Sequence, residues 1–136
     1  MKLILVSHGH LAKGMKNTLE MIVGHQDNVI ALSAYGEENN DFKTIVTREI
    51  ESNSHQPIVI LTDILGGSVN TELSKMVIQY EDVFLITGMN LSLALTLVTY
   101  AGTFDVKNIS RIVAESQKSI IFMNQAIQQA SEEEEL

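Results

Sequence analysis

Residues 1–14 of the chain read MKLILVSHGHLAKG. The apolar run Leu3–Val6 predicts a strand over about Lys2–Ser7, and its near-continuous hydrophobicity is typical of a strand covered on both faces. The run stops at His8, and a helical pattern follows it. Ligand sites in open α/β sheets lie just beyond the carboxyl ends of the strands. We therefore predict that His8 is the reactive residue, flanked by Ser7, Gly9 and His10.

Strand and helix patterns then alternate along the rest of the chain. Short apolar runs predict strands at Val29–Ser33, Ile58–Thr62 and Val83–Thr87. Apolar residues at helical spacing predict the intervening helices: one from Leu11 to a C-cap at Gly24, one capped by Asp41, and others at Val69–Tyr80, Leu91–Ala101 and around Ile109–Val113. This alternation predicts a doubly wound α/β fold with a mostly parallel, four-stranded sheet, strand order 2-1-3-4, and helices on both faces.

The predicted strand order places the first and third strands side by side. Because the chain leaves them for opposite faces, their carboxyl ends form a crevice. His8 lies at one of these ends and Asp63 at the other, followed by the turn Gly66-Gly67-Ser68. Asn90 follows the fourth strand and is expected to flank the same site.

These residues predict phosphoryl transfer. If the Asp63 carboxylate accepts a hydrogen bond from the imidazole Nδ1–H of His8, Nε2 is left as a nucleophile. A Gly-Gly-Ser turn at a helix N-terminus offers backbone N–H groups and a hydroxyl, which bind anions such as phosphate. The alternative is structural: a hydrogen-bonded histidine at a strand end, with Asp63 and the glycines serving only the turn.

Composition excludes several classes of protein. The 136 residues are 45% hydrophobic, the size and content of a single domain, and the formal net charge of −8 argues against binding to nucleic acid. There is no cysteine, so disulfides and thiolate chemistry are excluded. We expect no signal peptide, no membrane insertion and therefore a cytoplasmic protein.

Other site templates do not fit. Gly9 and Gly14 have the spacing of a P-loop start, but Met15 occupies the position of its lysine, and no Gly-x-Gly-x-x-Gly is present. His8 and His10 could share a metal, but the sequence suggests no third ligand. We expect neither a metal nor another cofactor.

The segment Leu91–Tyr100 is apolar around most of its circumference when drawn as a helix. In a monomer, one side of that helix would face water, so we predict a homodimer. Ser119–Met123 could continue a helix or form a last strand, and periodicity does not decide between them. Residues 1–130 are expected to form one domain, and residues 131–136 an acidic, solvated tail.

The three motifs at successive strand ends, Ser7-His8-Gly9, Asp63 with Gly66-Gly67-Ser68, and Gly88-Met89-Asn90, resemble a known family. They are similar to the IIA component of the mannose/fructose/sorbose class of the bacterial phosphoenolpyruvate-dependent sugar phosphotransferase system. The resemblance implies a phosphohistidine relay, in which a histidine-containing phosphocarrier protein donates the phosphoryl group and a IIB subunit accepts it.

The resemblance also assigns roles to particular residues. His8 matches the phosphorylated histidine, Asp63 the carboxylate that orients it, and Ser68 a hydroxyl near the phosphoryl group. It implies a homodimer that exchanges a C-terminal edge strand, which favours the strand alternative for Ser119–Met123. Some relatives continue into a fused IIB domain through a linker, whereas this chain ends at an acidic tail, so we expect a separate subunit.

The chain departs from the family pattern at two places. Val69 stands where many members have proline, and Asn90-Leu91-Ser92 replaces an Asn-aliphatic-Pro motif. Two alternative functions remain: a regulatory module phosphorylated on His8, which would share the expected site, and the phosphocarrier subunit of a dihydroxyacetone kinase, which has the same general fold. The Gly-Gly-Ser motif after Asp63 favours the sugar class over the latter.

Overall fold

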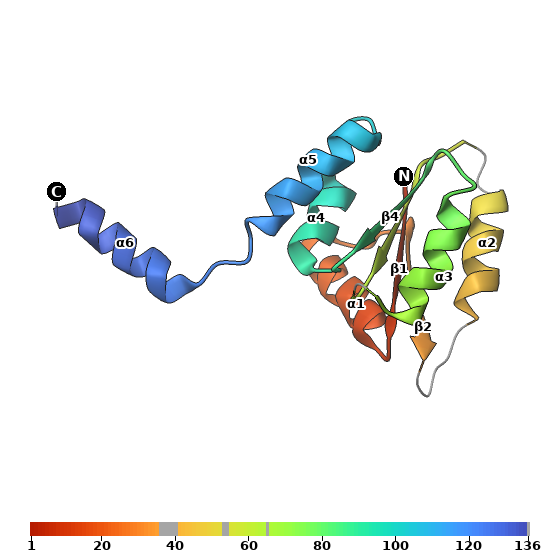
Figure 1. Cartoon of the computed structure of the whole chain (residues 1–136), viewed down its shortest axis with the longest axis horizontal. Helices are drawn as coiled ribbons and strands as arrows, with labels where there is room; N and C mark the ends of the chain where they lie inside the picture. The colour runs from red at the N-terminus through yellow and green to blue at the C-terminus, as the bar shows by residue number, and fades with distance from the viewer. Residues whose placement is uncertain (36–40, 53–54, 65, 136) are drawn as a thin grey trace.

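The computed structural model describes residues 1–35, 41–52, 55–64 and 66–135 (Figure 1). Parts of two predicted loops, residues 36–40 and 53–54, lie outside the described residues. The described elements, in chain order, are β1 Lys2–His8, α1 Leu11–Val23, β2 Val29–Tyr35, α2 Phe42–Ser52, β3 Ile58–Thr62, α3 Ser68–Val77, β4 Val83–Thr87, α4 Leu91–Thr99, α5 Val106–Gln117 and α6 Met123–Glu135.

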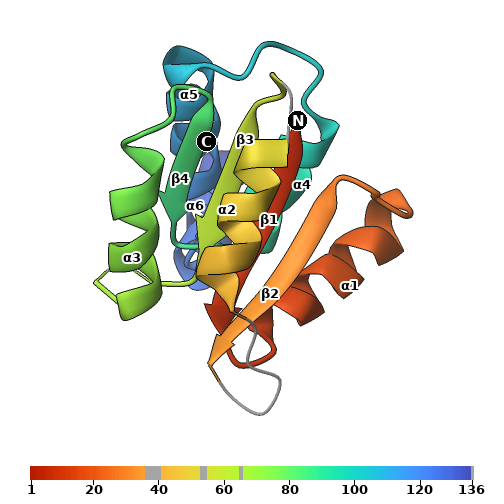
Figure 2. The same ribbon diagram turned by 90° about the vertical axis from the view of Figure 1, so that its right-hand side faces the viewer.

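The four strands form one parallel sheet in the order β2-β1-β3-β4, as predicted (Figure 2). β1 lies between β2 and β3, with Leu5 paired to Ala31 on one side and to Leu61 on the other. β1 and β3 are central strands, whereas β2 and β4 form the two edges. The carboxyl ends of β1 and β3 are therefore adjacent, as the predicted crevice requires.

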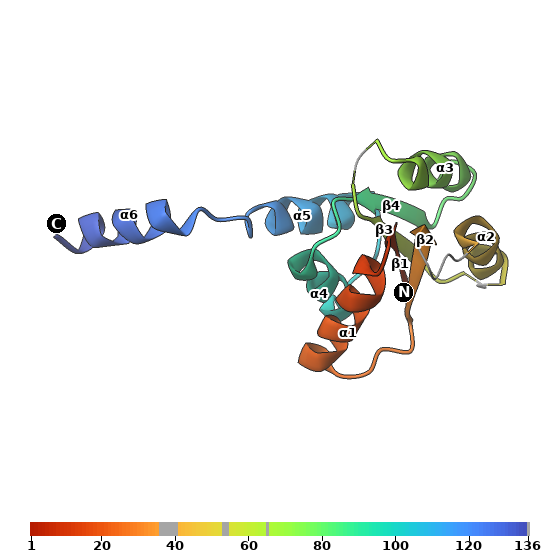
Figure 3. The same ribbon diagram turned by 90° about the horizontal axis from the view of Figure 1, so that it is seen from below.

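Helices cover both faces of the sheet, and alternate residues of β1 point to the two layers (Figure 3). Leu3 and Leu5 pack with residues of α1, α4 and α5. Ile4 and Val6 pack with residues of α2 and α3 on the opposite face. All four side chains are fully buried, which explains why the strand reads as a continuous apolar run.

The leucine-rich helix α4 is covered within the chain itself. Leu93, Ala94 and Leu97 are buried, and Leu91 and Leu95 are partly buried against the same core, to which α1 and α5 contribute. The expectation that one side of this helix faces water is therefore wrong, because α5 packs beside it. Among the described residues, no helix has both the length and the hydropathy needed to cross a membrane.

The C-terminal part of the chain extends from the body (Figure 1). No strand forms at Ser119–Met123 in this single chain: Ile120–Phe122 have no regular secondary structure and lead into α6. α6 has no buried residue, and it contains Glu132–Glu135, which are exposed as expected but helical. In the part of the chain that the structure describes, the sheet and the five helices before this arm form the packed body.

Replacing Leu97 with alanine tests the packing of α4. Leu97 is fully buried, so Leu97→Ala should lower the free energy of unfolding by about 2–5 kcal/mol through lost apolar burial and a residual cavity. The matched control is Val106→Ala on α5, where the side chain is 72% exposed and the change should stay within about 0.5 kcal/mol. Urea unfolding measures both. Equal midpoints for the two variants would contradict the burial of α4 against the sheet, beside α1 and α5.

Candidate functional site

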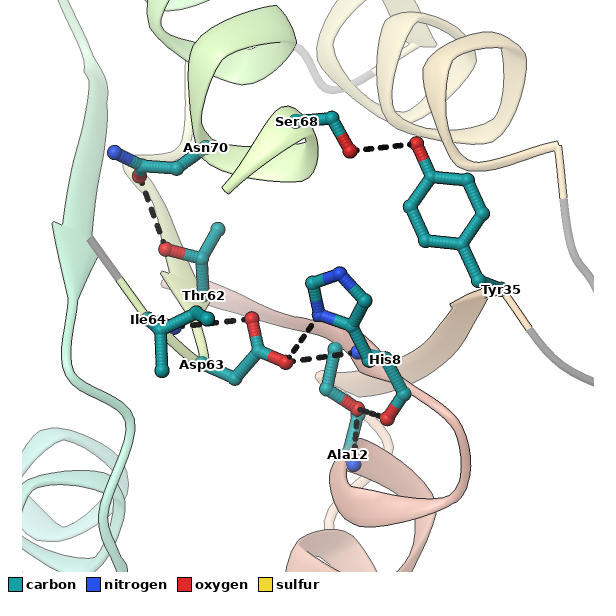
Figure 4. A network of polar contacts seen from close by, with 9 residues as sticks. His8, Ala12, Tyr35, Thr62, Asp63, Ile64, Ser68 and Asn70 are labelled. Atoms are coloured by element: carbon teal, nitrogen blue, oxygen red, sulfur yellow. Dashed lines mark hydrogen bonds and ion pairs between the residues drawn. The ribbon is translucent and has the colours of Figure 1, made fainter. Parts of the chain in front are cut away.

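His8 and Asp63 meet across β1 and β3, as predicted (Figure 4). His8 is the last residue of β1, and Asp63 directly follows β3. Asp63 Oδ2 accepts hydrogen bonds from the His8 backbone N–H at 2.9 Å and from the ring Nδ1 at 2.7 Å. A carboxylate offers only acceptors, so Nδ1 carries the proton and Nε2 keeps its lone pair. The His8 side chain is 44% exposed, whereas that of Asp63 is 10% exposed.

The environment of Asp63 stabilises the ionised carboxyl. Burial raises its pKa, but hydrogen bonds from the His8 backbone N–H, the His8 ring and the Ile64 N–H outweigh burial and lower the pKa below the ordinary value. Ile64 N donates to the second carboxylate oxygen, Oδ1, at 3.0 Å. The carboxylate is thus held by three N–H groups, and it presents a fixed negative charge to the imidazole.

The Gly66-Gly67-Ser68 turn lies beside the imidazole. Gly66 has φ +82°, a conformation that side chains disfavour, and a Cβ added to Gly67 would lie 3.6 Å from His8 Cε1. Ser68 begins α3, with Gly67 at the N-cap. Figure 4 shows His8 Nε2 facing the side of the site where the Ser68 hydroxyl lies. The turn is therefore placed where an anion bonded to Nε2 could reach it.

The predicted flanking residues have separate roles. Ser7 is fully buried; its hydroxyl accepts from Ala12 N at 2.7 Å and donates to the His8 carbonyl at 3.1 Å, which ties β1 to the first turn of α1. Gly9, with φ +54°, makes the turn between these elements. His10 is exposed at the N-cap position of α1.

Asn90 serves the start of α4. Its Oδ1 accepts from Leu93 N at 2.9 Å, and its Nδ2 donates to the Gly88 carbonyl at 3.1 Å. In the part of the chain that the structure describes, these hydrogen bonds belong to the helix cap and not to His8. In the same part of the chain, no cluster of three or more His, Asp or Glu side chains is suited to hold a metal ion.

Sequence reasoning missed Tyr35. The predicted strand ends at Ser33, whereas β2 continues to Tyr35, which is its last residue. Its ring lies 5.3 Å from the His8 ring, centroid to centroid, and its hydroxyl is 2.8 Å from Ser68 Oγ. The predicted strand order could have indicated part of this contact, because it makes β2 the other neighbour of β1 and so places the end of β2 beside His8. A further contact, Thr62 Oγ1 to Asn70 Oδ1 at 3.0 Å, joins the end of β3 to α3.

Comparisons with known proteins show the family to which the chain is related. The model of a family described as the PTS system fructose IIA component matches residues 2–117. A curated relative, the PTS system sorbose-specific EIIA component of Lacticaseibacillus casei, is 26% identical over 110 residues, which span 80% of each chain.

Solved structures of related proteins have the same fold. A protein assigned to the phosphoenolpyruvate-dependent sugar phosphotransferase system of Klebsiella pneumoniae is 31% identical, with a TM-score of 0.80 over 93% of each chain. The PTS IIA protein associated with the fucose utilization operon of Streptococcus pneumoniae is 27% identical, with a TM-score of 0.78 over 93% of this chain and 95% of that one.

A histidine held by a carboxylate at the switch point of a parallel sheet, beside a glycine-rich turn, defines a class of small α/β proteins suited to phosphoryl transfer. Within that class, the chain belongs to the mannose-type IIA family of the bacterial sugar phosphotransferase system. The resemblance seen in the three strand-end motifs is thereby confirmed.

The lowered pKa of Asp63 predicts an acid-dependent loss of stability. Because the folded-state pKa lies below the ordinary value of 3.8, the ionised carboxyl stabilises the fold at pH values above 3.8, and this contribution disappears as the pH falls through the lower, folded-state pKa. Asp63→Asn lacks this titration. We expect the stability advantage of the wild type over the variant to shrink below pH 3.8 in urea-unfolding experiments. If the difference in the free energy of unfolding between the wild type and Asp63→Asn stays constant with pH, the Asp63 charge does not stabilise the fold.

Proposed function

We propose that the protein is a phosphohistidine relay: His8 Nε2 accepts a phosphoryl group from the phosphohistidine of a phosphocarrier protein and passes it to a IIB subunit. The observation that carries the proposal is the double hydrogen bond of the His8 backbone N–H and ring Nδ1 to one oxygen of Asp63. These bonds fix both the tautomer and the direction of the ring, so that Nε2 is the nucleophile. The partners would act in the cytoplasm.

The transfer step balances without a cofactor. The lone pair of His8 Nε2 attacks phosphorus, a new N–P bond forms, and the N–P bond to the donor imidazole breaks with its electron pair returning to that ring. Nδ1 keeps its proton, so the phosphorylated ring gains a positive charge that Asp63 offsets. When the group passes to the IIB subunit, the acceptor of that subunit attacks phosphorus, and the N–P bond to His8 breaks with its electron pair returning to Nε2. Catalysis then depends on positioning and on stabilising phosphoryl charge, for which the Gly66-Gly67-Ser68 turn is suitably placed.

Exposure of the histidine suits transfer between proteins. The His8 side chain is 44% exposed, so a phosphohistidine on another protein can approach Nε2. Two exposed apolar side chains flank the site in sequence: Leu11 on α1 is 49% exposed, and Ile64, next to Asp63, is 60% exposed. Apolar side chains around a reactive group are typical of a surface that docks a partner protein.

Phosphorylation assays test the proposal. When the purified chain is incubated with phosphoenolpyruvate, enzyme I and the phosphocarrier protein, we expect an acid-labile, alkali-stable phosphoryl group on Nε2 of His8. His8→Ala should abolish labelling, and the control His10→Ala should retain it. Labelling of His8→Ala with loss in His10→Ala would overturn the assignment.

Asp63→Asn separates positioning from folding in the same assay. The amide can donate its N–H to the ring and favour the wrong tautomer, so we expect a folded variant with a strongly reduced transfer rate. An unchanged rate would remove Asp63 from the mechanism.

We also propose a homodimer, and the residues that support it lie at β4 and in the arm after α5, not in α4. β4 is an edge strand, and beside it lies a groove of about 230 Å³ whose lining includes Ile86, Thr87 and Ser116. Among the described residues, Thr87 Oγ1 and Ser116 Oγ are buried there without a hydrogen-bond partner. The arm that follows α5 exposes large apolar side chains: Ile120, Ile121, Phe122, Met123 and Ile127. The arm of a second copy, paired with β4, would cover both surfaces.

Sedimentation equilibrium tests the dimer. We expect a dimer mass at micromolar concentration and a shift toward monomer when both Ile121 and Phe122 are replaced by serine. The control is Met21→Ser on α1, where the side chain is 79% exposed outside the arm and the mass should not change. A monomer mass for the folded wild type would contradict the proposal.

A further inference from the structure

Tyr35 is held over the site by the backbone of β2. The pairing of β1 with β2 runs regularly to Ser7 and Ser33, and then an irregularity places His8 opposite Tyr35 instead of Ala34. Gly9 N donates to the Tyr35 carbonyl at 2.9 Å, which fixes the position beyond the irregularity. The extra residue in β2 therefore brings an aromatic side chain beside the reactive histidine.

The side chain of Tyr35 makes two contacts at the site. Its ring is tilted by 31° against the His8 ring, with centroids 5.3 Å apart. Its hydroxyl is 2.8 Å from Ser68 Oγ, so two hydroxyl groups from different elements meet there. Figure 4 shows both hydroxyls on the side of the site that His8 Nε2 faces.

The hydroxyls of Tyr35 and Ser68 carry two protons, and their mutual hydrogen bond uses one of them. Each hydroxyl has one donor and two acceptor lone pairs, so in the pair one O–H is engaged and the other remains available to a third group. A phosphoryl group on Nε2 brings three strong acceptor oxygens. Both hydroxyls can then turn their protons to it, and hydrogen bonds to a charged acceptor are about twice as strong as neutral ones.

A purely structural role explains less of this arrangement. The bond between Tyr35 and Ser68 is exposed, and a neutral hydrogen bond makes only a small net contribution to stability. Tyr35 itself is 43% exposed, so its ring adds little burial to the core. Contact with the His8 ring, together with a hydroxyl on the Nε2 side, is what a ligand of the phosphoryl group requires.

We propose that Tyr35 is a catalytic residue of the relay: its hydroxyl donates a hydrogen bond to the phosphoryl group carried on His8 Nε2, beside that of Ser68. The inference rests on the proposed function and adds a residue to it. The Tyr35 proton is shared in a hydrogen bond and not transferred, so the balance of the transfer step is unchanged. In the unphosphorylated chain, the bond to Ser68 keeps the hydroxyl in place.

Tyr35→Phe removes the hydroxyl and retains the ring beside His8. The chain is mixed with the phosphorylated phosphocarrier protein, and the division of the phosphoryl group between the two proteins is measured at equilibrium. We expect the equilibrium constant for transfer to the chain to be about tenfold lower for the variant than for the wild type, because one charge-assisted hydrogen bond to the phosphoryl group is lost. The control is Tyr80→Phe, on the turn after α3, which should leave the equilibrium unchanged.

A double variant distinguishes direct contact from bracing of Ser68. If Tyr35 acts only by holding Ser68, then Tyr35→Phe has no further effect once Ser68→Ala is present. If Tyr35 contacts the phosphoryl group, the substitution still lowers the phosphorylated fraction in that background. Absence of a further effect would overturn the proposal.

A measurement on the wild type avoids dependence on variant folding. The chain has three tyrosines, so ¹³C labelling at tyrosine Cζ gives three signals that report hydroxyl hydrogen bonding. We expect the Tyr35 signal alone to move when His8 is phosphorylated. A Tyr35 signal that stays in place on a phosphorylated chain overturns the role of Tyr35 and leaves the relay intact, whereas a chain that cannot be phosphorylated on His8 overturns both.

Discussion

The site depends on one carboxylate oxygen. Asp63 Oδ2 binds the backbone N–H and the ring Nδ1 of the same residue, His8, so the carboxylate fixes the strand end and the imidazole together. The bond to the backbone N–H alone would leave the ring free to rotate about its side-chain torsions, and the bond to Nδ1 alone would not tie the carboxylate to the strand end. Because both bonds converge on one atom, the direction of Nε2 follows from the pairing of β1 with β3. The parallel sheet is thus the element that sets the direction of Nε2.

The rest of the fold maintains that pairing. β1 and β3 are buried on both faces, and the helices that cover them divide the core into two clusters on opposite sides of the sheet. The buried Ser7 hydroxyl then links β1 to α1 just before the reactive residue. A chain that leaves β1 toward one layer and β3 toward the other opens the crevice between their ends. The core packing that holds β1 and β3 together therefore also positions His8, and it forms within a single chain.

Much of this arrangement could be predicted from the sequence, because it follows from strand order. The contact of His8 with Asp63 needed only the adjacency of the first and third strands. Tyr35 was missed because its position depends on a one-residue irregularity after Ser7, which leaves no trace in hydrophobic periodicity. Leu91–Tyr100 was correctly predicted as helical, but its covering by α5 depends on how two successive helices pack. Ser119–Met123 is too short for periodicity to decide, and it forms no strand in the single chain.

The relay that we propose would impose opposing demands on His8. The ring must be oriented, which favours burial, and it must also be reached by the phosphohistidine of another protein, which requires exposure. The structure separates the two demands between the nitrogens of one ring: Nδ1 faces a carboxylate that is 10% exposed, and the His8 side chain as a whole remains 44% exposed. The Asp63 carboxylate is thereby largely removed from water, where its attraction for the imidazole would be weaker. Nε2, by contrast, faces the hydroxyls of Tyr35 and Ser68, which can rotate, so the proposed phosphoryl group on Nε2 would not require the backbone that holds the ring to move.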